Sequence, residues 1–355
     1  MAGQRLVAVT GASGYIALHV IAQLLDAQYA VRGTLRDMAR AKKVREALNR
    51  HTDTSNLSFC ECNLLSDDGW DDALSGCTFL VHTASPLPIA EPKNHDDLII
   101  PARDGALRAL GAASRAGVKR VVMTSSVAAI GYGHDGKTDF SEDDWSIVKP
   151  EIGAYASSKT VAERAAWDFV AGLPKDEAFE FVTINPSLVV GPLLDPDGSA
   201  SIEVVRKYLA REVPGCPKFG FGMVDVRDVA SAHVAAMTAP EAPGHRYITN
   251  TEFRWLKQVA EQLDREFGPR GYPVSTRDVP DILVRLVALF DKAVRRIVPD
   301  LGQQKNFDSS AIRRDLGWQT RPMDESIRDT AESLIELNVV KARSFWRGTR
   351  NVSGL

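Results

Sequence analysis

The sequence predicts an α/β fold, with a doubly wound parallel sheet of the Rossmann type and a smaller, mainly helical C-terminal lobe. Two observations predict this class. Short apolar runs alternate with segments whose apolar side chains repeat at helical spacing, and a glycine-rich turn directly follows the first apolar run. Short loops between such segments are typical of parallel sheets.

The first strand, residues 6–10, is an apolar run that ends at the glycine turn, and the helix over 15–28 carries Ile16, Val20 and Leu24 on one face. The same alternation continues as far as residue 185. We expect further strands at 30–35, 57–62, 78–82, 120–124 and 179–184, and further helices at 40–50, 68–74, 99–116 and 154–170.

After Pro186 the pattern loosens, because 189–199 is rich in Pro, Gly and Asp and later helices such as 282–297 lack clear strand partners. We therefore expect residues 1–185 to form the Rossmann domain, with 224–250 returning to it. Residues 186–223 and 251–355 would form a substrate-binding lobe over the sheet edge where ligands bind. Asp225, Arg227 and Asp228 are expected to form a structural charge network at a helix start.

Composition excludes several classes of function. The chain has 355 residues, of which 44% are hydrophobic and 25% charged, as in an ordinary globular protein. A net charge of −3 gives no electrostatic reason to bind nucleic acid or an anionic membrane. The four cysteines lack partners at metal-ligand spacing, so we expect reduced thiols, no metal and a cytoplasmic location. The first apolar segment, 6–9, is too short for a signal peptide or a membrane span.

The turn Gly11-Ala-Ser-Gly14-Tyr-Ile-Ala17 predicts a dinucleotide site, because it leaves a strand and opens a helix. Glycine lets the backbone approach a pyrophosphate, and the helix N-terminus offers free N–H groups and a positive dipole end. The small side chain of Ala17 permits contact between helix and strand. The residues of this turn expected to bind the cofactor are Gly11, Ser13, Gly14, Tyr15 and Ile16.

The end of the second strand indicates which dinucleotide binds. An NAD site usually has a carboxylate there to hold the ribose 2′-hydroxyl. This chain has Leu35 followed by Arg36, with Lys43 on the next helix. An arginine binds a 2′-phosphate in bidentate fashion, and one such charged hydrogen bond contributes about 1.5–3 kcal/mol. We therefore expect NADP(H), although Asp37 weakens the positive field if its side chain faces the phosphate.

The segment Tyr155-Ala-Ser-Ser-Lys159 indicates the chemistry. Positions i and i+4 of a helix share a face, so the phenol and the ammonium point into one cleft. The ammonium favours the phenolate and is expected to lower the tyrosine pKa from about 10, which suits acid–base catalysis near neutral pH. Beside a dinucleotide, this pair indicates hydride transfer to or from a carbonyl group.

Six motifs then follow one another in the order typical of a known family. They are Val31-Arg-Gly-Thr-Leu-Arg36, His82-Thr-Ala-Ser-Pro86, Thr124-Ser-Ser126, Tyr155-Ala-Ser-Ser-Lys159, Asn185-Pro-Ser-Leu-Val-Val-Gly-Pro192 and Val224-Asp-Val-Arg-Asp-Val229. With them, the chain resembles the extended short-chain dehydrogenase/reductase superfamily over nearly its whole length. Within that superfamily it is most similar to the dihydroflavonol reductase-related carbonyl reductases, which include microbial ketone and aldehyde reductases.

The resemblance implies a role for each motif. Ser126 would bind the substrate oxygen, Tyr155 would donate the proton, and Lys159 would hold the nicotinamide ribose and tune Tyr155. Arg36 and Lys43 match the positions that bind the 2′-phosphate. The other implied cofactor contacts are Asn63 and Leu64 beside the adenine, Thr83, Ala84 and Ser85 along the pyrophosphate and ribose, Pro186, Leu188 and Val189 at the carboxamide, and Ser201. The family usually has Asp at the position of Asn63, so that contact departs from the pattern.

The leading interpretation is reversible, NADPH-dependent reduction of an aldehyde or ketone to an alcohol. Two alternatives stay open: a sugar-nucleotide epimerase or dehydratase that retains NAD, and a non-catalytic dinucleotide-sensing protein. The first usually ends its cofactor strand in an acidic residue, which this chain lacks. The second commonly lacks the Tyr/Lys pair.

Apolar residues next to the cofactor motifs indicate a hydrophobic carbonyl substrate, although core packing explains the same residues equally well. These pocket candidates are Leu87, Pro88, Tyr132, Leu193 and Met223. The motif that marks plant cinnamoyl-CoA reductases is absent around Tyr155, which argues against a CoA ester. Both a monomer and a homodimer fit the sequence.

Overall fold

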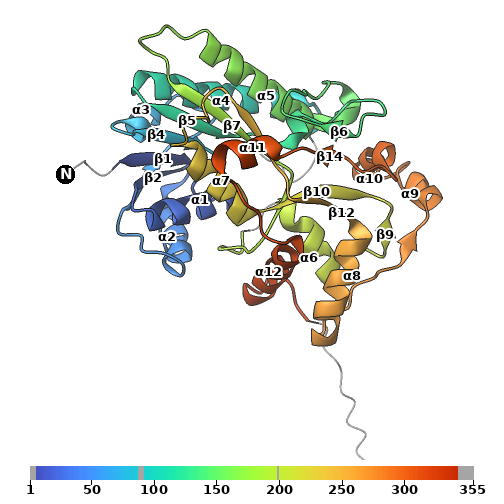
Figure 1. Ribbon diagram of the computed structural model, residues 1–355. Helices are drawn as coiled ribbons and strands as arrows, with labels where there is room; N and C mark the ends of the chain where they lie inside the picture. The colour runs from blue at the N-terminus through green and yellow to red at the C-terminus, as the bar shows by residue number, and fades with distance from the viewer. Residues whose placement is uncertain (1–4, 87–91, 198–199, 343–355) are drawn as a thin grey trace, which may run out of the picture.

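The computed structural model describes residues 5–86, 92–197 and 200–342. At its centre lies a seven-stranded parallel sheet in the order β11-β7-β5-β4-β1-β2-β3 (Figure 1). The strands are β1 (Leu6–Thr10), β2 (Ala30–Leu35), β3 (Leu57–Glu61), β4 (Phe79–His82), β5 (Arg120–Thr124), β7 (Glu180–Pro186) and β11 (Arg246–Thr249). The predicted doubly wound parallel sheet is therefore confirmed, and β11 extends it by one edge strand.

Helices cover both faces of this sheet (Figure 1). On one face lie α1 (Tyr15–Asp26) and α7 (Val226–Ala236), and on the other lie α3 (Trp70–Leu74), α4 (Asp96–Arg115) and α5 (Gly153–Ala171). Successive strand residues point to opposite faces, so Val7 and Val9 of β1 join the apolar layer of α1 and α7, whereas Ala8 joins that of α4. A parallel sheet with apolar strands requires this double cover.

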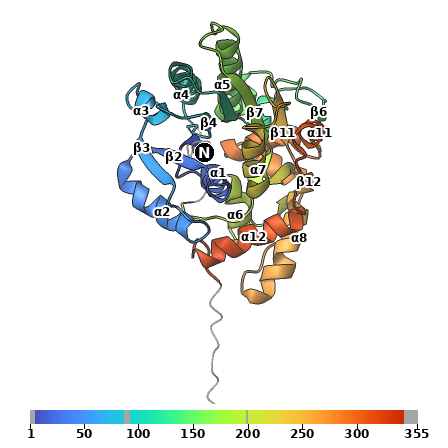
Figure 2. The same cartoon turned by 60° about the vertical axis from the view of Figure 1, so that its left-hand side comes forward.

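The C-terminal region combines helices with short strands. A small sheet forms from β10 (Gly220–Asp225), which pairs in parallel with β8 (Leu188–Val190) and antiparallel with β12 (Glu252–Trp255). The helices α6 (Glu203–Leu209), α8 (Leu256–Phe267) and α12 (Met323–Glu336) lie together beside it (Figure 2). They enclose a second apolar cluster that contains Val205, Met223, Leu263 and Ile327.

Two more pairs of very short strands complete the chain. β9 (Cys216–Pro217) pairs with β13 (Asp278–Val279), and β6 (Asp139–Phe140) pairs with β14 (Asn306–Phe307). These strands are two residues long, too short to show the alternation by which a strand is recognised in a sequence.

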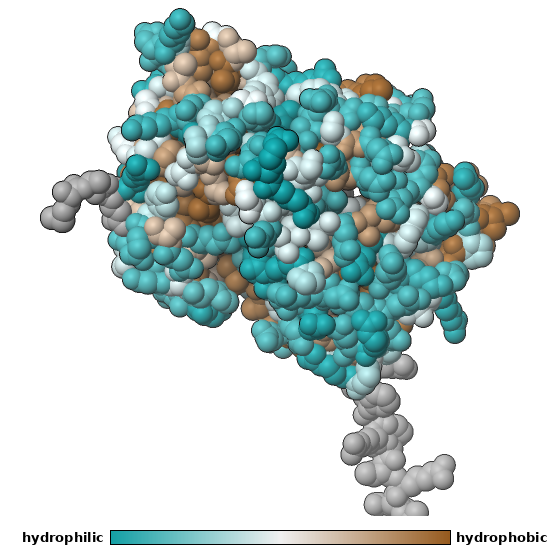
Figure 3. Space-filling view, in the orientation of Figure 1, coloured by the Kyte–Doolittle hydropathy of each residue, from teal (hydrophilic) through white to brown (hydrophobic). Residues whose placement is uncertain are grey.

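The single helix expected over 282–297 is wrong. The segment forms two short helices, α9 (Asp281–Val287) and α10 (Lys292–Ile297), because the Asp291 carboxylate accepts a hydrogen bond from the Val294 N–H at 3.2 Å and starts a new helix. Large apolar side chains are exposed around this break, and they form the brown edge on the right of Figure 3. They are Ile282, Leu283, Leu286, Val287, Leu289 and Phe290.

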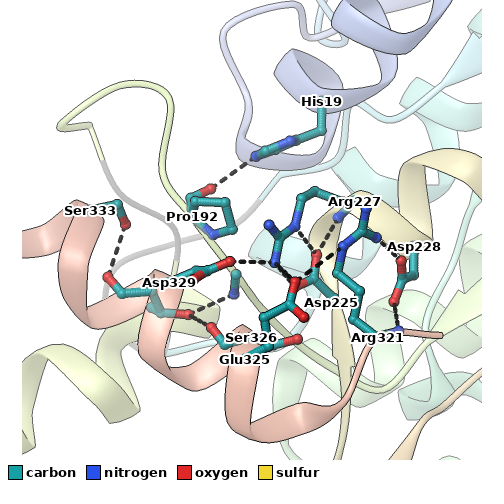
Figure 4. Close-up of polar contacts among 12 residues, drawn as sticks. His19, Pro192, Asp225, Arg227, Asp228, Arg321, Glu325, Ser326, Asp329 and Ser333 are labelled. Atoms are coloured by element: carbon teal, nitrogen blue, oxygen red, sulfur yellow. Dashed lines mark hydrogen bonds and ion pairs between the residues drawn. The ribbon is translucent and has the colours of Figure 1, made fainter. Parts of the chain in front are cut away.

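A charge network ties α12 to the start of α7 (Figure 4). The fully buried Asp225 caps α7 by accepting from the Arg227 N–H at 2.7 Å, and its carboxylate pairs with the Arg227 guanidinium at 2.7 Å. The same guanidinium lies 2.8 Å from Asp329 on α12. Asp228 accepts a hydrogen bond from the Arg321 backbone N–H at 2.8 Å. The expected charge network at a helix start is present.

The loop after β8 is held between α1 and α12 (Figure 4). Burial lowers the pKa of His19 to about 4, so its ring is neutral at pH 7, and Nε2 lies 2.9 Å from the Pro192 carbonyl oxygen. From the other side, Ser333 on α12 accepts a hydrogen bond from the Leu193 N–H at 2.9 Å. These contacts fix the start of a loop that continues to Asp195 and Asp197.

Among the residues that the structure describes, no helix is long and apolar enough to cross a membrane. The same residues include no group of three or more His, Cys, Asp or Glu side chains placed to hold a metal ion.

Candidate active site

The carboxyl ends of the parallel strands open into a cavity of about 740 Å³. Ligands of open α/β sheets bind at this edge, because the loops after neighbouring strands meet there. Most residues expected to contact a dinucleotide line it, and most of these end or follow the strands β1, β2, β3, β4 and β7. They are Gly11, Ser13, Gly14, Tyr15, Ile16, Arg36, Asn63, Leu64, Thr83, Ala84, Ser85, Pro186, Val189 and Ser201.

The glycine turn has the geometry that a pyrophosphate requires. Gly11 has φ +68°, and a Cβ on it would lie 3.1 Å from the Cβ of Ala84 at the end of β4. The Gly14 N–H donates to the Gly11 carbonyl at 2.8 Å, and Gly14 caps α1 without a side-chain hydrogen bond. The first-turn N–H groups of α1 therefore remain available at the cavity wall, where Tyr15 and Ile16 lie.

The corner beyond β2 is basic, but its composition differs from the expectation. Arg36 and Arg40 line the cavity, whereas Lys43 does not. Lys43 Nζ instead lies 3.1 Å from Asp195 and 2.8 Å from Asp197, and Arg40 lies 2.7 Å from Asp197. The position of Lys43 on α2 (Ala41–Asn49) directs it to the loop after β8, where Arg40 also contacts Asp197, and its binding of the 2′-phosphate stays a prediction.

Two acidic residues at this corner behave differently. Asp37 accepts a hydrogen bond from the Ala39 N–H at 2.9 Å and caps its own 3₁₀ turn, so it does not line the cavity. Asp197 lines the cavity, and it comes from a segment more than 150 residues away in the chain. Sequence reasoning missed both Asp197 and Arg40, although Arg40 lies only four residues after Arg36.

The three expected catalytic residues lie together at the far wall of the cavity. Ser126 follows β5, and its hydroxyl accepts from the Ala128 N–H at 3.1 Å and is hydrogen-bonded to the Tyr155 phenol. Tyr155 and Lys159 lie one turn apart on α5. Tyr155 is 37% exposed, into the cavities that it lines, whereas Lys159 is only 8% exposed.

The pKa values of this pair differ from the expectation. Burial raises the pKa of Tyr155, and the hydrogen bond from Ser126 only partly offsets this effect. Burial also lowers the pKa of Lys159 to about 8, against the opposing effect of Glu163. The expected lowering of the tyrosine pKa is wrong for the ligand-free chain, because the loss of water around the phenol outweighs the hydrogen bond from Ser126.

Glu163 lies one further turn along α5, fully buried behind Lys159. Its carboxylate accepts hydrogen bonds from Thr183 Oγ1 at 3.0 Å, Asn185 Nδ2 at 2.8 Å and Arg246 Nε at 2.7 Å. It also accepts from the Ser125 hydroxyl. One carboxylate thus connects α5 to β7, β11 and the segment after β5. Sequence reasoning missed this residue, although its spacing of four from Lys159 gives the signal.

A second cavity, of about 340 Å³, meets the first at Ser126 and Tyr155. Its wall is largely aromatic, with Phe219, Phe221, Phe253, Phe307 and Tyr132. Leu188 lines this second cavity rather than the first, while Val189 lines the first. Neighbouring strand residues point to opposite sides, which explains this difference, and the cofactor contact of Leu188 stays a prediction.

The other pocket candidates have separate outcomes. Tyr132 lines the second cavity, as expected. Leu193 and Met223 do not line it, since both are buried in the apolar cluster of the C-terminal region. The candidates Leu87 and Pro88 lie outside the described residues.

Comparison with known proteins identifies the family. The model of the NAD dependent epimerase/dehydratase family matches residues 7–250, more than half of the chain. The chain belongs to this family. The resemblance to extended short-chain dehydrogenases/reductases is therefore confirmed.

Individual relatives are also similar over most of the chain. Cinnamoyl-CoA reductase CAD2 of Medicago truncatula is 33% identical over 339 residues, which cover 93% of this chain and 96% of that protein. The bifunctional dihydroflavonol 4-reductase/flavanone 4-reductase of Malus domestica is 30% identical, over 78% of this chain and 80% of that protein. The structure of the yeast methylglyoxal/isovaleraldehyde reductase Gre2 complexed with NADPH has a TM-score of 0.79 at 27% identity, and covers 94% of this chain and 99% of that one.

The buried Lys159 gives a prediction about stability and pH. Its pKa falls from 10.5 in the unfolded chain to about 8 in the folded one, so the unfolded state binds more protons between these values. The free energy of unfolding of the wild type therefore increases as the pH rises across this window, whereas Lys159→Met lacks this increase. Denaturant unfolding of the ligand-free proteins measures this effect. The free energy of unfolding of the variant, relative to that of the wild type, should be highest below pH 8 and should decrease toward pH 10.5. A difference independent of pH would contradict the assignment.

Proposed function

We propose that this protein is an NADPH-dependent reductase that converts an aldehyde or a ketone into an alcohol, reversibly. The observation that carries the proposal is the position of Ser126 and Tyr155, which line both the larger cavity at the strand ends and the smaller aromatic one. During reduction, the carbonyl group must lie where the dinucleotide cavity meets the substrate pocket. A proton donor at that junction is within reach of the carbonyl oxygen.

The residues of the larger cavity fit NADPH. The turn at Gly11 and the first amides of α1 would hold the pyrophosphate, and Arg36 with Arg40 would hold the 2′-phosphate. We assign the adenine to Asn63 and Leu64, the pyrophosphate and ribose path to Thr83, Ala84 and Ser85, and the nicotinamide end to Pro186, Val189 and Ser201. When bound, NADPH supplies the hydride that the chemistry requires.

The side chains of this chain would supply the proton and the stabilising charge. Negative charge develops on the carbonyl oxygen during reduction, and hydroxyl donors directed at that oxygen stabilise it. Ser126 would donate one hydrogen bond to the oxygen, and the Tyr155 phenol would transfer its proton there. Lys159 would hold the ribose and, as an ammonium, favour the phenolate that Tyr155 leaves behind. The raised pKa of Tyr155 keeps the proton available in the ligand-free chain.

Several relatives support this reading. The named activities include reduction of a cinnamoyl-CoA, a dihydroflavonol, methylglyoxal and isovaleraldehyde, and all are reductions of a carbonyl group. We assign cofactor binding to residues 1–185 with 224–250, and substrate binding to 186–223 and 251–355. The substrate would be a small hydrophobic carbonyl compound, and the compartment would be the cytoplasm.

The role of Tyr155 is tested by Tyr155→Phe. Removal of a general acid typically costs about 100- to 10,000-fold in turnover, whereas the phenyl ring keeps the shape of the cavity. NADPH oxidation with a panel of aryl ketones, aliphatic aldehydes and ketoesters should fall by that factor, while NADPH affinity stays within about two-fold. Undiminished turnover would refute the role of Tyr155. If the wild type never consumes NADPH in proportion to product, a cofactor-retaining epimerase becomes the better account.

A further prediction concerns Asp197, which neutralises Arg40 and Lys43 at the corner assigned to the 2′-phosphate. Asp197→Asn raises the positive potential there, and since the pairs are exposed the gain is modest, about two- to five-fold in NADPH affinity. NADH affinity should not change, because NADH lacks the phosphate. Fluorescence titration with both cofactors measures the ratio of NADPH affinity to NADH affinity.

The matched control is Glu46→Gln, which removes one negative charge from α2, the helix that carries Lys43. Glu46 pairs at 3.9 Å with the exposed Lys42 and does not line the cavity. Its ratio of NADPH to NADH affinity should equal that of the wild type. An Asp197→Asn ratio equal to that of the control would show that the phosphate binds elsewhere.

A further inference from the structure

The charged side chains that line the second cavity come from one stretch of the chain, in a wall formed otherwise by aromatic, aliphatic and small residues. Asp300, Gln303 and Lys305 line it, and all three come from the segment between α10 and β14. Lys305 Nζ lies 3.0 Å from Asp300 Oδ2, with the two side chains 17% and 25% exposed. This ion pair therefore borders the space that a substrate body would fill, and little water surrounds it.

Tyr132 connects this ion pair to the proton donor. Lys305 Nζ lies over the Tyr132 ring, 4.5 Å from its centroid. Burial raises the pKa of Tyr132, and both Asp300 and Tyr155 raise it further, so Tyr132 lies close to each of them. A substrate whose carbonyl group lies at Ser126 and Tyr155 would extend past Tyr132 to the Asp300–Lys305 pair.

The charges of the pair select the group that fits beside it. Because the pair is neutral overall, a carboxylate gains from Lys305 and loses to Asp300. A hydrogen atom or a methyl group would remove water from two charged groups and return no hydrogen bond. A hydroxyl group satisfies both partners, because its oxygen accepts from the Lys305 ammonium while its hydrogen donates to the Asp300 carboxylate.

We propose that Asp300 and Lys305 determine substrate specificity, and that the substrate is a neutral aromatic or aliphatic carbonyl compound with a hydroxyl group remote from the carbonyl. This inference rests on the proposed reductase function and adds the chemical class of the substrate. One charged hydrogen bond of this kind corresponds to a preference of about ten-fold over the compound without the hydroxyl. The preference appears mainly in KM, since the hydroxyl is distant from the reacting atoms.

The test compares matched substrates and variants. The substrates are 4-phenylbutan-2-one and its 4-hydroxyphenyl and 4-carboxyphenyl derivatives, together with the corresponding acetophenones, which vary the distance between the two groups. The variants are Lys305→Met and Asp300→Asn. Lys257→Met serves as the control, because Lys257 forms a similar ion pair with Asp278 at 2.7 Å on the surface and does not line the cavity.

For at least one spacing, the wild type and the control should prefer the hydroxylated ketone by about ten-fold in kcat/KM. Lys305→Met should reduce this ratio to about one. Asp300→Asn should raise the kcat/KM of the carboxylated ketone by about ten-fold relative to the unsubstituted one, because the ammonium then has no carboxylate beside it. Equal ratios for hydroxylated and unsubstituted ketones in the wild type, or ratios unchanged in both variants, would overturn the inference.

A binding measurement separates this inference from the proposed function. Calorimetric titration of the NADP⁺ complex with the same ketones gives their dissociation constants. In each variant, these should rank the ketones in the same order as the kcat/KM values do. If no ketone is reduced but the hydroxylated compounds still bind more tightly through Lys305, the proposed function fails and the assignment of the pair holds. If ketones are reduced with no preference in either measurement, the assignment of the pair fails alone.

Discussion

The buried carboxylate of Glu163 holds the catalytic wall together. It is fully buried, and its partners come from the segment after β5, from β7 and from β11. Arg246 neutralises its charge and then donates to the carbonyl oxygens of Glu142 and Asp144 at 2.7 Å. Loss of one partner from a buried pair of this kind costs about 3–5 kcal/mol, so the alignment of α5 with the strand ends is strongly enforced. Because Tyr155 and Lys159 lie on α5, this alignment also fixes their position.

The same arrangement explains why the two cavities meet where they do. Ser125 bonds to Glu163, and the next residue, Ser126, bonds to Tyr155, so the end of β5 is fixed against α5 at two successive positions. The glycine turn at the end of β1 opens the larger cavity on one side of this wall. The aromatic side chains of β10, β12 and β14 close the smaller cavity on the other side. The proposed reduction would thereby be confined to the junction.

Local patterns in the sequence sufficed for the parallel sheet and for the cofactor cavity. The strands expected before residue 185 are rich in apolar residues, and most of them end at a residue that lines the cavity or directly precedes one. The glycine turn and the Tyr155/Lys159 spacing carry their geometry within a few residues, so a sequence reveals them. The spacing of four residues between Lys159 and Glu163 is equally local, but Glu163 belongs to no recognised motif.

The remaining features depend on contacts between distant segments. The interaction of Lys43 with Asp195 and Asp197 joins α2 to the loop after β8, and nothing in either segment indicates the other. The aromatic pocket combines β10, β12 and β14 with Tyr132, all widely separated in the chain. The raised pKa of Tyr155 depends on how completely the fold removes water, which residue spacing does not reveal.

The central claim is that a hydride passes to a carbonyl carbon at the junction of the two cavities, while Tyr155 protonates the oxygen. Incubation of the protein with a reducible ketone and NADPH deuterated at both C4 positions, followed by mass spectrometry and NMR of the alcohol, tests it most directly. The account predicts one deuterium on the carbinol carbon of each product molecule and one NADPH consumed per alcohol formed. A product without deuterium at that carbon, or turnover without net consumption of NADPH, would contradict it.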